Sequence, residues 1–212
     1  MSSEVHIANR ALLRVGETRI ITDIEERTTN AELCFLCLDD MRRAELEAHP
    51  WKFAIRTVQL PEVKGIRGFE NKNVFQLPVD YLRMWRPQGG GTGYDGFDSF
   101  PIRSGSGVVS GVPVGSFEIQ DGYYVSNDFA PIEISYVRDL KKISQMSPLF
   151  IEAWILRVAQ TICEPITQSK GRLEGIRKEY KQVIQKARQS DAFNRGPLRI
   201  RRSSYIRGRQ GF

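Results

Sequence analysis

Apolar residues recur at spacings of three and four near the N-terminus. They are Val5, Ala8, Ala11, Leu12 and Val15. This spacing places them on one face of a helix, so it predicts an amphipathic helix over the segment. Ser2 and Ser3 before the segment, and Gly16 after it, are residue types that satisfy the free backbone groups at the two ends of a helix.

A second helical pattern begins at Thr29. Thr29 and Glu32 have the spacing of a capping box, in which each side chain accepts a hydrogen bond from the other's backbone N–H. His49 and Pro50 end the pattern, because the residue before a proline disfavours the helical conformation. The residues predicted to share the inward face are Leu33, Cys37, Met41, Ala44 and Ala48.

The middle of the chain, from Trp51 to about Leu140, has a different pattern. Short runs of β-branched and aromatic residues are separated by Gly and Pro, which is typical of strands and turns. Asp121-Gly122 favours the positive φ angles of a tight hairpin. Nine Gly and three Pro between Pro87 and Gly115 predict a long exposed loop with poor internal order. The predicted strands are 53–60, 74–77, 81–85, 116–120, 123–126 and 132–137.

Helical spacing returns after Ser147-Pro148, a capping residue followed by a proline suited to the first helical position. Glu164-Pro165 is expected to end or kink this third helix, and Gly196-Pro197 to terminate the fourth. The apolar face of the third comprises Phe150, Ile151, Trp154, Ile155, Val158, Ala159 and Ile162. In the fourth, Leu173, Ile176, Tyr180, Val183, Ile184 and Ala187 are predicted to face inward, and Arg172, Lys178, Lys181, Gln185 and Arg188 outward.

Four amphipathic helices cannot each remain exposed, so the N-terminal and C-terminal pairs are expected to pack into one bundle. The predicted fold class is α+β: a four-helix bundle with an inserted β-rich lobe and an extended basic C-terminal arm. The bundle would comprise residues 1–50 and 141–194, the lobe residues 51–140, and the arm residues 195–212.

Composition places the chain among ordinary globular proteins. It has 212 residues, of which 41% are hydrophobic and 26% charged, enough to bury one sizeable core. No stretch approaches the roughly 20 apolar residues of a membrane helix, and the N-terminus lacks an export signal, so a cytosolic product without membrane contact is expected. Three cysteines are too few for a disulfide framework.

The net charge of +6 is concentrated at the C-terminus. Six of the 31 basic residues and no acidic residue follow Asn194, so residues 1–194 are formally neutral. The segment mixes arginine with apolar residues but cannot form a core alone. It is either a solvated terminus or an arm that orders on a partner, protein or DNA. The residues expected to contact that partner are Leu198, Arg199, Ile200, Arg201, Arg202, Tyr205, Ile206, Arg207 and Arg209.

Motifs for catalysis, metal or cofactor binding are weak. Cys34 and Cys37 form a C-x-x-C inside a predicted helix, and core packing is the favoured interpretation. His6 and His49 lack a nucleophile nearby in sequence, and the run 89–93 lacks the lysine and helix of a phosphate-binding loop. We therefore predict no catalytic residue, metal or cofactor. A hydrolase would need a buried, perturbed carboxylate in a cleft; the helix-borne candidates are Glu32, Glu45, Glu47 and Glu164.

Three segments together resemble the tail tubular protein A family of short-tailed bacteriophages. The first is 8–17 (ANRALLRVGE), followed by a capped helix that ends at 49–54 (HPWKFA). The second is 75–83 (FQLPVDYLR), with a Leu-Pro-x-Asp turn. The third is 134–137 (ISYV), leading into 150–165 and a long final helix that ends near 191–193 (DAF). The segments follow the family's order over nearly the whole chain.

This resemblance implies a helical bundle with a β-rich lobe, a ring of twelve copies, and a position in the virion tail between the portal protein and the tail nozzle protein. Such a protein is structural and not an enzyme, assembles in the host cytoplasm, and lines the channel through which DNA leaves. On this hypothesis the arm docks on the portal and the β lobe meets the nozzle.

The alternative is a DNA-binding virion protein that uses the arginine-rich tail on phosphates. The neutral body and the absence of a basic face on the predicted helices argue against it. The glycine-rich loop and the arm lie outside the matching segments, so the resemblance assigns them no contacts.

Overall fold

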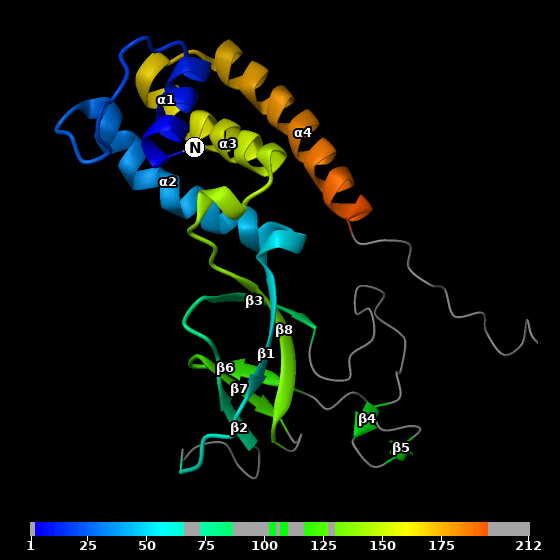
Figure 1. Ribbon diagram of the computed structural model, residues 1–212. Coiled ribbons are helices and arrows are strands. Elements are labelled where there is room, and N and C mark those ends of the chain that lie inside the picture. Colours follow the sequence, from blue (N-terminus) through cyan, green and yellow to red (C-terminus); the bar gives the residue numbers. More distant parts are fainter. Residues whose placement is uncertain are drawn as a thin grey trace, which may run out of the picture.

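A computed structural model describes residues 3–65, 73–86, 102–104, 107–109, 117–126 and 130–194. Over these residues the protein is an α+β structure with four α-helices and two small three-stranded antiparallel sheets. The helices gather at one end of the molecule and the sheets at the other (Figure 1). The strands lie between the second and third helices in the sequence.

The first helix, α1 (Glu4–Val15), forms where the apolar spacing predicts it. The Ser3 hydroxyl accepts a hydrogen bond from the backbone N–H of His6 at 3.2 Å. Gly16 has a φ of 92°, a conformation that glycine adopts without strain, and its N–H bonds carbonyls of the last turn. Both predicted caps are confirmed.

The second helix, α2 (Thr29–Ala48), differs from the prediction at its start and on its inward face. The cap is Thr28 and not Thr29: the Thr28 hydroxyl accepts from the N–H of Ala31 at 3.3 Å. The predicted inward positions Ala44 and Ala48 are exposed. The helix is rotated toward its polar residues, and its buried positions are Ala31, Cys34, Cys37, Leu38, Arg42, Glu45 and Leu46. Apolar spacing alone misplaces this face because two of its members are charged.

The C-terminal helices are α3 (Pro148–Thr167) and α4 (Lys170–Phe193). Ser147 caps α3 as predicted, accepting from the N–H of Phe150 at 3.2 Å. Of the two expectations for Pro165, that it ends α3 is wrong: it lies inside the helix, which continues to Thr167 and stops at Gln168 with a φ of 50°. A kink at Pro165 stays a prediction. The predicted inward face of α4 is confirmed: its apolar residues are buried or pack against the core.

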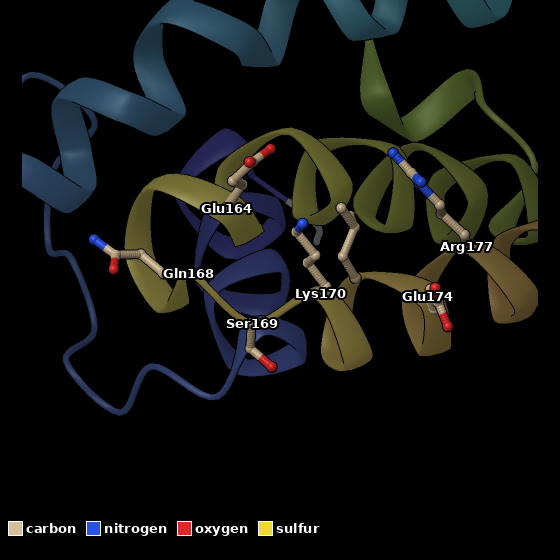
Figure 2. Close-up of a pocket in the computed structure, with 7 residues that line it drawn as sticks. Glu164, Gln168, Ser169, Lys170, Glu174 and Arg177 are labelled. Atoms are coloured by element: carbon tan, nitrogen blue, oxygen red, sulfur yellow. The ribbon is translucent and has the colours of Figure 1, made fainter.

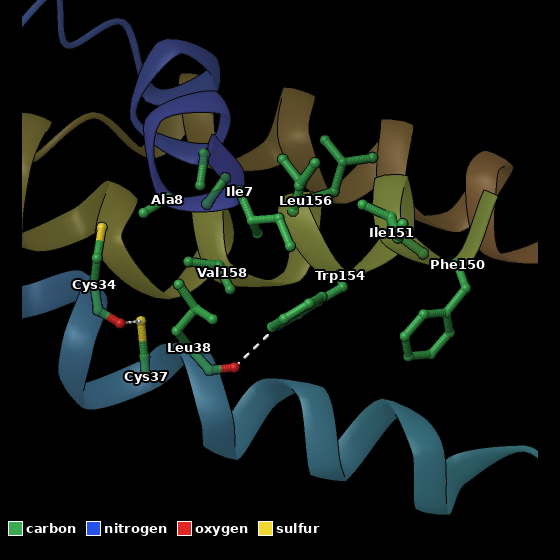
Figure 3. Packing of buried hydrophobic residues seen from close by; sticks show 14 of the residues in the cluster. Ile7, Ala8, Cys34, Cys37, Leu38, Phe150, Ile151, Trp154, Leu156 and Val158 are labelled. Carbon is green, nitrogen blue, oxygen red and sulfur yellow. Dashed lines mark hydrogen bonds between the residues drawn. The ribbon is translucent and has the colours of Figure 1, made fainter. Parts of the chain in front are cut away.

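One hydrophobic core contains residues from all four helices. The helix α3 packs against each of the other three and therefore occupies the centre. Trp154 on α3 is fully buried, and its indole N–H donates to the carbonyl of Leu38 on α2 at 3.0 Å (Figure 3). Tryptophan combines a large apolar surface with a donor that needs a partner when buried, and this site provides both.

The strands form two sheets around a second, smaller core. In one sheet β8 (Ile132–Arg138) lies between β1 (Ile55–Leu60) and β3 (Tyr81–Arg86); in the other β7 (Tyr123–Ser126) lies between β2 (Asn73–Gln76) and β6 (Glu118–Gln120). The buried residues of this core are Leu60, Phe75, Leu77, Tyr124, Ile132, Ile134 and Tyr136. Because they come from both sheets, burying them holds the two sheets together.

Most predicted strands are confirmed, with two differences. Residues Lys52–Ala54 form a 3₁₀ turn, so β1 begins at Ile55. Within the predicted loop the structure describes a short hairpin of β4 (Ile102–Ser104) and β5 (Gly107–Val109), which the sequence did not predict. The rest of the loop lies outside the described residues, so its predicted poor order stays a prediction. The Asp121-Gly122 hairpin is confirmed, with φ angles of 51° and 80°.

Polar contacts connect the helices to one another and to the segments that flank the sheets. The buried Arg42 guanidinium on α2 donates to Asp139 and, at 2.8 Å, to the carbonyl of Leu140, directly after β8. The backbone N–H of Lys52 donates to Asp191 on α4 at 2.8 Å. In the part of the chain that the structure describes, no helix is both long and apolar enough to cross a bilayer.

Candidate interaction surfaces

The predicted partner-binding arm lies outside the described residues. This holds for Leu198, Arg199, Ile200, Arg201, Arg202, Tyr205, Ile206, Arg207 and Arg209. Its contacts therefore remain a prediction. The functional surfaces described below belong to residues 3–194, with the gaps stated above.

The cysteines pack in the helical core. Cys34, Cys37 and Cys163 are buried and free. Burial raises the pKa of the Cys34 thiol to about 12 and that of Cys37 to about 11, because a thiolate would lose its hydration there. These two thiols stay protonated at neutral pH, and the described residues contain no group of three potential metal ligands. Core packing, the favoured interpretation of the C-x-x-C, is confirmed.

A charged cluster lies where α2, α3 and α4 meet. Glu45 on α2 is 4% exposed and accepts a hydrogen bond from the Tyr180 hydroxyl on α4 at 2.6 Å. Arg157 on α3 approaches the same carboxylate oxygen at 3.7 Å and lies over the Tyr180 ring. The second oxygen of Glu45 has no hydrogen-bond partner among the residues that the structure describes. Burial raises the pKa of Glu45, and the Tyr180 hydroxyl and the Arg157 charge oppose the shift only in part.

Replacing Glu45 with Gln should change how stability depends on pH. A carboxyl group whose pKa is raised by folding contributes its full stability below its ordinary pKa of 4.5 and loses it as the pH rises through the folded value. Urea unfolding of wild type and Glu45→Gln should therefore diverge in favour of the variant between pH 4.5 and neutrality. A constant difference across that range would contradict the assigned burial effect.

Glu45 is buried, as the catalytic carboxylate of a hydrolase would be, but it does not line a described cleft. Neither of the two surface depressions found over the described residues includes it among its lining residues. The first depression, of about 320 Å³, lies at the turn from α3 into α4 (Figure 2). Its carboxylates, Glu164 and Glu174, are both exposed and lie among Lys170 and Arg177. Exposed groups whose opposite charges balance are suited to contact with another protein surface.

The second depression, of about 420 Å³, lies among the strands. The turn between β2 and β3 and the β6–β7 hairpin line it, and the two are joined by a 3.0 Å hydrogen bond from the N–H of Leu77 to the carbonyl of Gly122. Val79 is fully exposed beside it, and Ile119 is 40% exposed. Apolar side chains gathered at an exposed turn are a feature of protein contact sites.

The outward face of α2 is acidic with an apolar centre. The helix holds five acidic residues and two arginines, and Glu45 is the only one of those acids that is buried. Leu36 is 70% exposed, and Glu32 and Asp40 lie one turn before and after it. We call Glu32, Leu36, Asp39, Asp40 and Glu47 the acidic face. The exposed Arg43 lies among these residues and Asp39 pairs with Arg42, so the face is acidic on balance.

The outward face of α4 is basic. The helix holds seven basic and three acidic residues, and all seven basic residues are exposed. Within the described chain, Arg177, Lys178 and Lys181 form no ion pair. The expectation that the helices lack a basic face is therefore wrong, because charge summed over residues 1–194 conceals opposite charges on α2 and α4. We call Lys170, Arg177, Lys178, Lys181 and Arg188 the basic face. The exposed Glu174 lies among them, so the face is basic on balance.

Gly175 lies beside the basic face, on the exposed side of α4, and no contact within the described chain requires a glycine there. It has no described atom within 4 Å of the position that a Cβ would occupy, and its φ is not positive. Glycine inside a helix is less favourable than alanine by about 1 kcal/mol. Gly175→Ala should therefore raise the free energy of unfolding, measured by urea titration, by about 1 kcal/mol. A lower free energy of unfolding would show that this position makes a contact outside the described residues.

Comparison with known proteins finds no match: no protein-family model and no curated protein sequence is similar to this chain. The functional assignment therefore depends on the sequence segments and on the geometry described above.

Proposed function

We propose that the protein is the repeating subunit of a head-to-tail adaptor ring in a tailed bacteriophage, joining the portal to the tail nozzle around the DNA channel. The helices would form a four-helix bundle that repeats around the ring, the strands a lobe directed at the nozzle, and residues 195–212 an arm on the portal. The observation that carries the proposal is the ordered set of segments that resemble the tail tubular protein A family.

The positions of those segments in the fold support the proposal. The first supplies most of the buried face of α1, including Ala8, Leu12 and Val15, and the Gly16 turn that ends the helix. Residues 49–54 form the turn from α2 into β1, where the buried Trp51 donates to the carbonyl of Glu45 at 2.8 Å. The Leu77-Pro78 segment forms the turn between β2 and β3, and the adjoining Asp80 accepts from the Tyr136 hydroxyl at 2.7 Å. The first two segments thus include turns that join elements, whereas 134–137 lies within β8 and 150–165 within α3, where they supply buried residues of the two cores.

Removing residues 197–212 tests the assigned role of the arm. We expect binding to the phage's portal ring to fall by at least about tenfold, since the arm would supply several apolar and charge-assisted contacts at the interface. The control replaces the same residues with a Gly/Ser segment of equal length, which keeps chain length but removes the side chains. Unchanged portal binding in either variant would refute the arm's role.

The basic face of α4 favours one alternative, a DNA-binding virion protein that uses this face together with the C-terminal arginines. Binding to phosphates releases counterions, so affinity for a DNA duplex would fall steeply with salt, with a log–log slope near the number of contacts. Fluorescence anisotropy over a salt series measures that slope. The acidic face of α2 opposes this alternative, because it would repel the same duplex.

A further inference from the structure

We infer that the acidic face of α2 in one copy docks on the basic face of α4 in the next copy. This contact rests on the proposed ring, and it specifies which surfaces close it. The two faces belong to the same chain, carry opposite charge, and have similar lengths of about 30 and 36 Å, given 20 and 24 helical residues.

The two faces point in different directions, as a repeating contact requires. The central helix α3 separates α2 from α4, which lie on either side of it in Figure 1. Their direct contact within one chain runs through inward side chains, Glu45 and Tyr180. Because the acidic and basic faces are the outer surfaces of these helices, each copy offers two unlike surfaces. An interface between unlike surfaces repeats head to tail and closes into a ring when the rotation permits.

The acidic face has the composition of an interface centre. Leu36 is exposed where an isolated helix would be expected to carry a polar residue, and Phe35 beside it is 58% exposed. Charged residues surround Leu36 one turn away on both sides. Apolar residues enclosed by charged ones are the usual arrangement of a protein contact site.

The basic face stays positive when its acidic neighbour is counted. The exposed Glu174 lies one turn from Lys170, Arg177 and Lys178, so five basic residues accompany one carboxylate. A neighbour's Asp40 and Glu47 would therefore meet an excess of cations.

Opposite charge favours a second copy over DNA as the occupant. A duplex would use only the basic face and leave the acidic one unexplained, whereas a neighbouring copy uses both. Steering by opposite charge also makes the contact sensitive to salt. The proposal therefore expects self-association at low ionic strength that weakens as salt is added.

Charge reversal on each face tests the inference. The first variant, Lys178→Glu with Lys181→Glu, removes most of the positive charge of the α4 face; the second, Asp40→Lys with Glu47→Lys, removes the negative charge of the α2 face. Neither pair forms an ion pair within the described chain. Sedimentation equilibrium at low salt and millimolar protein should show association at least about tenfold weaker for each variant alone, because the attraction between opposite charges is then lost.

Mixing the two variants gives the decisive result. In the mixture the acidified α4 meets the basified α2, and the unchanged faces also match, so alternating copies should associate as strongly as wild type. The matched control, Lys141→Glu with Lys142→Glu, reverses two exposed lysines off both faces and should associate normally. Circular dichroism must show the wild-type helical signal in every variant.

Three outcomes would overturn the inference: wild-type protein that remains monomeric at low salt, variants that associate normally, or a mixture without recovery. Loss of binding to a DNA duplex by the α4 variant, with no recovery in the mixture, would assign the basic face to DNA instead. Imaging with the portal separates this failure from that of the proposed function: rings whose neighbours meet through other surfaces would overturn the contact and leave the adaptor function standing.

Discussion

Trp154→Ala is expected to lower the free energy of unfolding by about 4 kcal/mol. The side chain is fully buried at the centre of the helical core, and its indole N–H donates a hydrogen bond to the carbonyl of Leu38. Truncation removes apolar burial, opens a cavity between α2 and α3, and leaves that carbonyl without its partner. Urea titration followed by circular dichroism measures the loss.

Two further variants serve as controls for this prediction. Trp154→Phe keeps most of the volume and loses the hydrogen bond, so it should cost clearly less than the alanine variant. Phe193→Ala removes an aromatic side chain that is 85% exposed, and it should change stability by no more than about 0.5 kcal/mol. Equal losses for the core and the surface variants would mean that α3 does not form the centre of the fold.

Arg42→Met should cost about 3 kcal/mol, the second largest effect expected. The Arg42 side chain is 4% exposed and pairs with Asp39 and Asp139, while a further N–H donates to the carbonyl of Leu140. Methionine replaces the aliphatic stem and leaves Asp139, at 17% exposure, without its principal partner. Because the contacts join α2 to the end of β8, the loss should loosen the strands relative to the helices.

A double-mutant cycle that combines Arg42→Met with Asp139→Asn measures the energy of the Arg42–Asp139 ion pair apart from the other contacts of the two residues. The two single variants should not be additive, since each removes the same ion pair. Hydrogen exchange should show faster exchange in β8 for Arg42→Met than for Arg43→Met, whose guanidinium is half exposed and lies 3.7 Å from the same carboxylate. Additive losses would indicate that the pair contributes little.

The helices and strands follow from local sequence patterns, and most of them were predictable. The capping signals at Ser3, Gly16 and Ser147 act within a few residues, and the structure confirms each of them. The inward face of α2 was not predictable from the same signals. Arg42 and Glu45 are buried against Asp139 and Tyr180, which lie 97 and 135 residues away in the sequence. A pattern within the helix cannot indicate such distant partners.

The interaction surfaces also divide into one that the sequence indicates and others that only the structure shows. The sequence draws attention to the arginines after residue 194, where six lie together without an acid. It does not draw attention to α4, because the acids of α2 balance its positive charge in any sum over the chain. Counting charge by predicted element would have found both faces, since Lys170, Arg177, Lys181 and Arg188 recur at spacings of seven and four. Predicting that α3 separates the two faces required the packing.

Electron microscopy of this protein mixed with the portal of its phage tests the central claim most directly. The adaptor account predicts a closed ring of this chain seated on the portal, with the helical parts side by side and an open channel along the axis. Single copies scattered on the portal, or no bound protein, would contradict it.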